Sequence, residues 1–501
     1  MTCAPRLPRR AGVLLHPSSL PGRYGIGDFG WQAKRFVDVI AEAGQGVWQI
    51  MPLGPAGPGN SPYAARSSFA FNPLLVSPDS LAEQGLLVGD DLADVPSGDP
   101  TRVDYEAVKA WKRDRLRRAF RRFSERPEPP ELAEFRALAA SWLPDFCLFM
   151  ALRERHGWWA NWPEPLRRRE PQALAEAREW FADEIRFHEF VQWSAHTQWA
   201  SLRRYANERG VEIIGDIPIF VDHDSADVWA HQENFKLDER GLPTVVAGVP
   251  PDAFSATGQR WGNPLYDWDR LRERSYDWWI ERFRWTLQQV DIIRIDHFRG
   301  FQAAWEVPAD AETAQAGQWV HGPGRDLFDT ARHTLGNLPI VVEDLGLITD
   351  EVRALRDELG FPGMDVLQFA FGDDARSPYL PHNVRAASVI YTGTHDNDTT
   401  AGWLASLDGE TRARLNRYLG REDCDVRDIV RLAYASVAYM AIVPMQDILG
   451  LGSEARMNVP GHAEGNWAWR MTEEQLNSCD MSWLLELGQT YGRLPGINVS
   501  W

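Results

Sequence analysis

Three carboxylic acids, Asp296, Glu343 and Asp396, lie in short segments suited to nucleophilic and acid–base chemistry. Arg294 precedes Asp296 by two residues, so both side chains share one face of a strand, and the guanidinium favours the ionised carboxylate that a nucleophile needs. Glu343 follows a different apolar run, where an enclosed environment would raise its pKa and make it a proton donor. Two carboxyl groups in these roles, about 5 Å apart, are the arrangement that retaining cleavage of a glycosidic bond requires.

Eight short apolar runs predict the strands that position these acids. Several are continuous runs of Val and Ile, which is typical of strands buried on both faces of a parallel sheet. Helical patterns separate them, and strands that alternate with helices about eight times predict a (β/α)8 TIM barrel of the α/β class. The runs cover 12–16, 47–53, 211–220, 291–297, 338–345, 364–371, 388–395 and 441–449. The clearest helical patterns cover 31–43, 271–290, 326–335, 350–359 and 427–439.

The spacing of these runs is uneven and predicts two insertions on the C-terminal side of the barrel. Residues 1–54 and 211–501 are expected to form the catalytic barrel. Residues 55–210 are rich in charged helical patterns and are expected to form an inserted, mainly helical subdomain. Residues 221–290, rich in Gly, Pro and aromatic residues, are interpreted as a long substrate-binding loop within the barrel.

Polar side chains follow most of the predicted strands, where a barrel of this type carries its active site. Charged residues that only cap strands would be scattered over both ends of the sheet, so their convergence on one rim favours a functional site. A structural ion pair between Asp296 and His297 is an alternative, but it leaves Glu343 and Asp396 unexplained. The residues at these positions are His16, Asp216, Asp296, Glu343, Asp396, Gln446 and Asp447.

The bulk composition excludes several other classes of function. The 501 residues carry a formal net charge of −18, which disfavours nucleic acid and anionic membranes as partners but does not repel a neutral sugar. The four cysteines are far apart, so no CxxC metal or redox pair is present and a cytoplasmic location is expected. The apolar run 11–15 is too short for a signal peptide, and no stretch approaches a membrane span.

Two patterns raise alternatives to carboxylate chemistry. His16, His297 and His395 suggest a metal site, but the first strand shows no His-x-His pair, so no metal is expected. The basic cluster within 112–122 is interpreted as a solvated helix face over buried Leu116 and its neighbours. A nucleic-acid site would need more than one such helix.

Longer motifs occur in a fixed order along nearly the whole chain. Together they resemble the 4-alpha-glucanotransferase family (amylomaltase or disproportionating enzyme, glycoside hydrolase family 77) of the α-amylase superclan. The motifs are GVLLHPSSLPG at 12–22, WQIMPLGP at 48–55, SPY at 61–63, GDIPIF at 215–220, GVPPD at 248–252, QRWGNP at 259–264, RIDHFRG at 294–300, EDLG at 343–346, THDN at 394–397 and NWAWR at 466–470.

The resemblance implies an enzyme of carbohydrate metabolism that transfers a segment of an α-1,4-glucan to the 4-hydroxyl of glucose or another glucan. Asp296 would be the nucleophile, Glu343 the acid and base, and Asp396 would stabilise the sugar ring. No cofactor and no metal are implied, and the partners would be maltooligosaccharides, amylose and related glucans. The implied substrate-binding residues are Ser61, Tyr63, Asp216, Gln259, Trp261, Arg294, His297, His395 and Asn466.

The segment 247–266 is expected to bind the acceptor and to exclude water, through mobile glycines and the aromatic residues Phe254, Trp261 and Tyr266. The chain departs from patterns of the family at Ala253, where some members have tyrosine, and at Phe71, where many have glycine. Two alternatives stay open at this stage. One is an α-1,4-glucan hydrolase with the same acids, and the other is a glucan-binding protein without catalysis.

Overall fold

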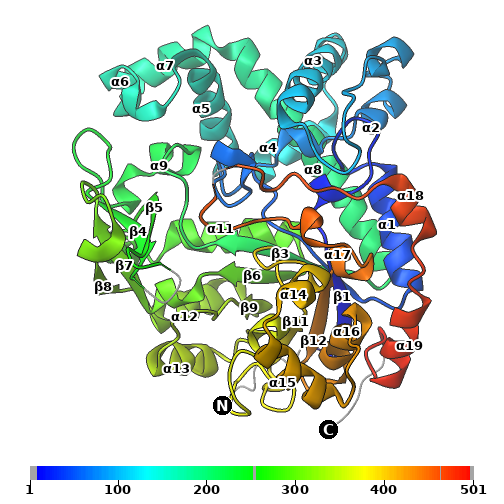
Figure 1. The fold of residues 1–501 in the computed structure, drawn as a ribbon. Coiled ribbons are helices and arrows are strands. Elements are labelled where there is room, and N and C mark those ends of the chain that lie inside the picture. Colours follow the sequence, from blue (N-terminus) through cyan, green and yellow to red (C-terminus); the bar gives the residue numbers. More distant parts are fainter. Residues whose placement is uncertain (1–7, 252–254, 463, 497–501) are drawn as a thin grey trace.

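The computed structural model describes residues 8–251, 255–462 and 464–496, and its centre is a parallel sheet closed into a barrel (Figure 1). Neighbouring strands pair in the order β10-β11-β12-β1-β2-β3-β6-β9. The Val342 amide donates to the Pro362 carbonyl at 2.9 Å, which joins the two ends of this sheet. The (β/α)8 prediction is confirmed. The strands are β1 (Arg10–Leu14), β2 (Val47–Gln49), β3 (Glu212–Pro218), β6 (Ile292–Asp296), β9 (Ile340–Val342), β10 (Gly363–Val366), β11 (Ser388–Tyr391) and β12 (Met440–Pro444).

Both faces of the barrel strands are apolar, which explains the continuous Val and Ile runs. Ile214, Ile292 and Val341 belong to a cluster built from all eight strands. Their sequence neighbours Ile213 and Ile293 belong instead to the large core shared with the helices. Because successive side chains of a strand point to opposite faces, the first cluster fills the barrel and the second packs the helices outside it.

Helices cover the outside of the barrel. The C-terminal part of α8 lies against two other helices of this layer. The Tyr205 hydroxyl donates to Asp38 of α1 at 2.9 Å, and Trp199 Nε1 donates to the Gln289 carbonyl of α11 at 2.9 Å. A domain boundary at residue 210 stays a prediction. These helices are α1 (Trp31–Glu42), α8 (Ala182–Glu208), α10 (Trp268–Glu273), α11 (Asp277–Gln289), α12 (Arg325–Leu335), α13 (Asp350–Leu359), α14 (Thr400–Ser406), α15 (Gly409–Leu419), α16 (Val426–Ala435), α17 (Met445–Ile448), α18 (Glu473–Ser478) and α19 (Ser482–Thr490).

A helical region rises on one side of the barrel, at the top of Figure 1. Among the described residues no single helix is long and apolar enough to cross a membrane, and only the bent pair α4 and α5 passes such a test together. These helices are α2 (Pro78–Glu83), α3 (Tyr105–Ser124), α4 (Pro130–Leu138), α5 (Leu143–His156), α6 (Glu164–Arg167) and α7 (Pro171–Trp180).

The basic face of α3 is solvated only in part: Arg113, Arg118 and Arg121 are exposed, whereas Lys112 and Arg115 are not. Lys112 is buried, and its ammonium donates to the Val76 carbonyl at 2.7 Å and pairs with Asp28 at 3.2 Å. Arg115 is also buried and donates to the carbonyls of Asp91 and Ala93. The interpretation was wrong for these two residues, because they find carbonyl and carboxylate partners inside the protein.

The segment 247–266 is not an irregular loop. It contains a β-hairpin in a second, antiparallel sheet of order β5-β4-β7-β8, beside the barrel (Figure 1). Tyr266 is buried, and its hydroxyl donates to the Ile219 carbonyl at 2.8 Å, so its predicted role in stacking is wrong. Ala253 and Phe254 lie outside the described residues. The elements are β4 (Val245–Val249), β5 (Gln259–Pro264), β7 (Ala303–Pro308), β8 (Gln318–His321) and the short α9 (Ala226–Ala230).

Candidate active site

Asp296, the last residue of β6, is held by the arginine two residues before it. Arg294 Nη1 lies 2.9 Å from Asp296 Oδ1 and 2.6 Å from Asp216 Oδ2 on the neighbouring strand β3. Burial alone lowers the pKa of Arg294, but the two aspartates raise it well above its ordinary value. The guanidinium therefore stays charged and lies beside both carboxyl groups.

Glu343 follows β9 directly and is held by backbone amides. The His297 amide donates to Glu343 Oε2 at 2.7 Å, and the Leu345 amide donates to Oε1 at 2.9 Å. His297 adopts a left-handed conformation (φ 52°), which is uncommon for a residue with a side chain and marks the turn after Asp296.

The environment of Glu343 keeps its carboxyl group protonated at neutral pH. Burial raises its pKa to about 8, and the charge of Asp296 adds to this shift. Arg294 and the two backbone amides oppose the shift without cancelling it. Adjacent strand ends therefore carry an arginine-paired aspartate and a protonated glutamic acid, the states that a nucleophile and a proton donor require.

Asp216 and Tyr63 form a second layer beside Arg294. The Tyr63 hydroxyl donates to Asp216 Oδ2 at 2.7 Å, whereas Asp216 Oδ1 is buried and has no hydrogen-bond partner among the described residues. Burial raises the pKa of Asp216 to about 6, opposed by Arg294. The Tyr63 ring stacks on His395, with centroids 5.1 Å apart, and lies 5.7 Å from the Trp467 ring.

Asp396 follows β11, and its side chain is about half exposed. His395 Nε2 lies 3.4 Å from Asp396 Oδ1, and the Asn458 side-chain amide donates to the same oxygen at 2.6 Å. Arg456 donates to the Asp396 carbonyl at 2.7 Å. Sequence reasoning missed Asn458 and Arg456, which lie after the last strand. The only available signal was the nearby motif at 466–470.

The hairpin of β4 and β5 places an exposed aromatic ring at the edge of the site. Trp261 lies edge-on to the His297 ring, with centroids 4.8 Å apart, and its indole donates to Gln259 Oε1 at 3.2 Å. Burial lowers the pKa of His297 to about 4, so its imidazole is neutral at pH 7. Because 40% of Trp261 is exposed, its ring is accessible to a sugar.

Two predicted binding residues bond to the backbone of their own loops. Ser61 Oγ accepts from the Tyr63 amide at 3.2 Å. The Asn466 side chain accepts from the Val459 amide at 2.9 Å and donates to the His462 carbonyl at 2.9 Å. The structure thus places Tyr63, Asp216, Arg294 and His395 beside the acids. Ser61 and Asn466 instead stabilise the conformation of neighbouring loops.

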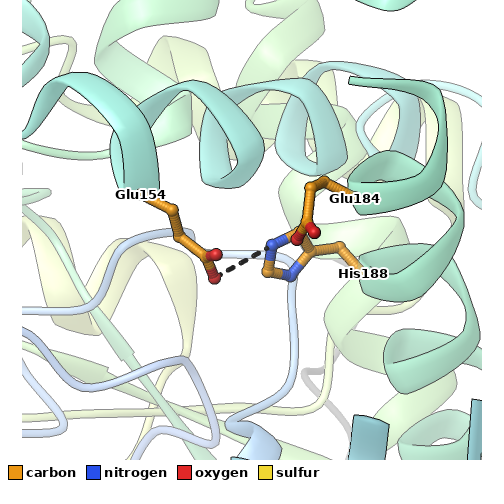
Figure 2. Close-up of side chains that lie close together, drawn as sticks. All are labelled: Glu154, Glu184 and His188. Atoms are coloured by element: carbon orange, nitrogen blue, oxygen red, sulfur yellow. Dashed lines mark ion pairs between the residues drawn. The ribbon is translucent and has the colours of Figure 1, made fainter. Parts of the chain in front are cut away.

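One cluster of potential metal ligands lies elsewhere, in the helical region (Figure 2). This α5–α8 acid cluster consists of Glu154 on α5 with Glu184 and His188 on α8, whose ligand atoms lie within 4.8 Å of one another. Arg113 pairs with Glu154 at 2.6 Å, and Arg117 pairs with Glu184. Two guanidinium groups thus occupy these carboxylates, which is the chemistry of an ion-pair network.

The fold and the site together define a carboxylate-dependent barrel enzyme that acts on glycosidic bonds. The family model for 4-alpha-glucanotransferase matches residues 15–476. The chain belongs to this family and is a 4-alpha-glucanotransferase that acts on α-1,4-glucans.

Individual relatives agree with this assignment along the whole chain. The 4-alpha-glucanotransferase of Thermus thermophilus is 51% identical over 94% of this chain and 96% of its own length. That of Synechocystis sp. is 49% identical over 97% of this chain and 98% of its own. The structure of amylomaltase from Streptococcus agalactiae in complex with acarbose has a TM-score of 0.94 at 40% identity, covering 97% of this chain and 99% of that one.

Proposed function

We propose that Asp296, Glu343 and Asp396 divide the transfer reaction between them as nucleophile, acid–base and sugar-ring stabiliser. The observation that carries this proposal is the contrast between neighbouring strand ends, where Asp296 is paired with Arg294 and Glu343 is kept protonated. A retaining double displacement needs these two states at the same time.

In the first step, an Asp296 carboxylate oxygen forms a bond to the anomeric carbon of the donor glucan. The bond from that carbon to the glycosidic oxygen breaks, and Glu343 gives its proton to the departing 4-oxygen. In the second step, the Glu343 carboxylate takes the proton from the 4-hydroxyl of an acceptor glucan. The oxygen of that hydroxyl then attacks the anomeric carbon, and the bond from this carbon to Asp296 breaks.

The remaining residues are proposed to place the sugars. Asp396 accepts hydrogen bonds from hydroxyls of the reacting ring, and Asp216, whose Oδ1 is buried, holds Arg294 beside Asp296. Trp261 on the hairpin provides an exposed aromatic face for the acceptor and helps to exclude water. The substrates are maltooligosaccharides, amylose and other α-1,4-glucans. The free Cys147, Cys424 and Cys479 are consistent with a reducing compartment, and we propose the cytoplasm.

Incubation with maltotriose tests transfer against hydrolysis. A transferase produces glucose together with longer oligosaccharides and leaves the number of reducing ends constant. A hydrolase produces only shorter sugars, and reducing ends increase with each bond cleaved. If reducing ends rose in step with maltotriose consumption, water and not a sugar would be the acceptor, and the proposed transfer would be contradicted.

A further inference from the structure

A separate cavity of about 250 Å³ lies where α5, α9 and α11 meet. Its lining includes none of the three catalytic acids. Three aromatic residues, Phe69, Trp142 and Trp278, form part of its wall. Ligand pockets for drug-sized molecules usually span about 300–1,000 Å³, so this cavity suits a smaller molecule, of the size of one sugar ring.

The two tryptophans of this cavity have unused hydrogen-bond donors. Trp142 and Trp278 are 5% and 4% exposed, and neither indole nitrogen has a hydrogen-bond partner among the described residues. Buried tryptophan N–H groups usually find a partner, because an unmade hydrogen bond costs free energy. Two such donors on one cavity wall point to a ligand that carries acceptor oxygens.

Acceptors line the same cavity. Asp227 is buried, with Oδ2 accepting from the Ser68 amide at 2.6 Å, while Oδ1 has only a 3.5 Å contact with the Ser67 hydroxyl. Glu281 accepts from the Ser141 hydroxyl at 3.0 Å. Asp145 and Asp277 also line the cavity, and Asp277 is paired with Arg274 at 2.8 Å. The wall therefore presents donors and acceptors together around an aromatic surface.

We propose that this cavity binds one neutral sugar ring, with glucose as the natural candidate. Sugar hydroxyls donate to the carboxylates of Asp227 and Glu281 and accept from the indole N–H groups. The carboxylates that line the cavity disfavour an anion, and the two indole N–H groups need acceptor oxygens, which an organic cation does not offer. The apolar C–H face of the ring packs on Trp142 or Trp278.

The cavity shares one segment of chain with the active site. Ser67, Ser68 and Phe69 contact or line the cavity, and Tyr63, a few residues earlier, donates to Asp216. A change at Asp227 would release the Ser68 amide and disturb the active site. Ala230 and Trp278 line the cavity on other elements. The Trp278 ring packs edge-on against Phe69, with centroids 5.9 Å apart, and Trp278→Phe keeps an aromatic ring at this contact.

The test is saturation-transfer NMR of glucose bound to the full-length protein, with acarbose added in excess to occupy the active site. The wild type is expected to retain an acarbose-insensitive glucose signal. Ala230→Leu fills the cavity and is expected to abolish that signal. Trp278→Phe keeps a ring but removes one donor, so glucose is expected to bind about fivefold more weakly.

Trp279→Phe is the matched control. Trp279 is also fully buried with an unpartnered indole nitrogen, but it does not line the cavity, so its substitution is expected to leave glucose binding unchanged. Each variant is checked for its melting temperature and for maltotriose turnover, which measures the active site independently. The proposal is overturned if no acarbose-insensitive signal exists, if Trp278→Phe and Trp279→Phe bind glucose equally well, or if tetramethylammonium binds the cavity in place of glucose.

Discussion

The acids of the active-site rim (Asp216, Asp296 and Glu343) and those of the α5–α8 acid cluster both lie near arginines. The two groups differ in how the carboxylates are paired. At the rim, Arg294 bonds to Asp216 and Asp296, and Glu343 is met by backbone amides. Burial raises the pKa of Glu343 to about 8, although these backbone amides oppose the shift.

In the α5–α8 acid cluster, burial also acts to raise the pKa of Glu154, but His188, Arg113 and Arg117 together lower it below its ordinary value. A glutamate that is enclosed and lacks a bonded cation becomes a proton donor, whereas a glutamate between guanidinium groups becomes a structural anion. The presence of acids, a histidine and arginines does not by itself make an active site.

The largest expected effect is a loss of activity on substitution of Asp296, which a purely structural ion pair would not show. Asp296→Asn removes the proposed nucleophile and is expected to lower kcat for maltotriose disproportionation by about 10⁴-fold or more. The melting temperature serves as the control for folding. Turnover within tenfold of the wild type would remove Asp296 from the mechanism.

Glu343→Gln is expected to lower kcat by about 10²–10⁴-fold, because a positioned acid contributes that much. The wild-type rate of the first step should fall as pH rises through about 8, where Glu343 loses its proton. The variant should lack this alkaline limb, and a donor with a leaving group that needs no proton, such as α-glucosyl fluoride, should recover much of the first step. An alkaline limb that persists in the variant would assign the titration to another group.

Stability should respond in opposite directions in the two groups. Glu343 has a folded-state pKa of about 8, above its ordinary value of 4.5, so the folded protein loses stability as pH rises between these values. Glu343→Gln removes this loss and is expected to raise the melting temperature by about 2–4 °C at pH 8, with little change at pH 5.

Glu154→Gln is the counterpart in the α5–α8 acid cluster. It should lower the melting temperature by about 1–2 °C at pH 7 and leave kcat unchanged, because it removes the partner of Arg113. The pKa of Glu154 is lowered, so its contribution to stability is present above its ordinary pKa and disappears as pH falls. Melting curves of both variants from pH 4 to 9 check the two signs, and equal signs would refute the contrast.

The smallest effect is expected for Tyr63→Phe, which removes one hydrogen bond to Asp216 and keeps the ring that stacks on His395. A loss of about fivefold to tenfold in kcat/KM for maltotriose is expected. Trp305→Phe on the outer sheet also removes one hydrogen bond, to the Ala314 carbonyl, and serves as the control with unchanged kinetics. A loss above a hundredfold would make Tyr63 a direct participant in the chemistry.

The barrel strands were predictable because buried parallel strands need apolar residues on both faces, and each of the eight runs overlaps one strand. The hairpin of β4 and β5 was not predictable, since Gly and Pro within it resemble an irregular loop and its partner strand β7 is distant in sequence. The buried Lys112 was missed for a similar reason. Its partners Asp28 and Val76 lie on other segments, and no local pattern reports them.

The sequence by itself determined which side chains are present at the strand ends and therefore the kind of chemistry that this rim supports. Apolar strand patterns and family motifs are local features, so they can be recognised in the sequence without a structure. Only the tertiary structure decided that Arg294 bonds to both Asp216 and Asp296, while Glu343, within the described part of the chain, accepts from the backbone amides of His297 and Leu345. Protonation depends on burial and on neighbours from other strands, which exist only once the barrel has closed.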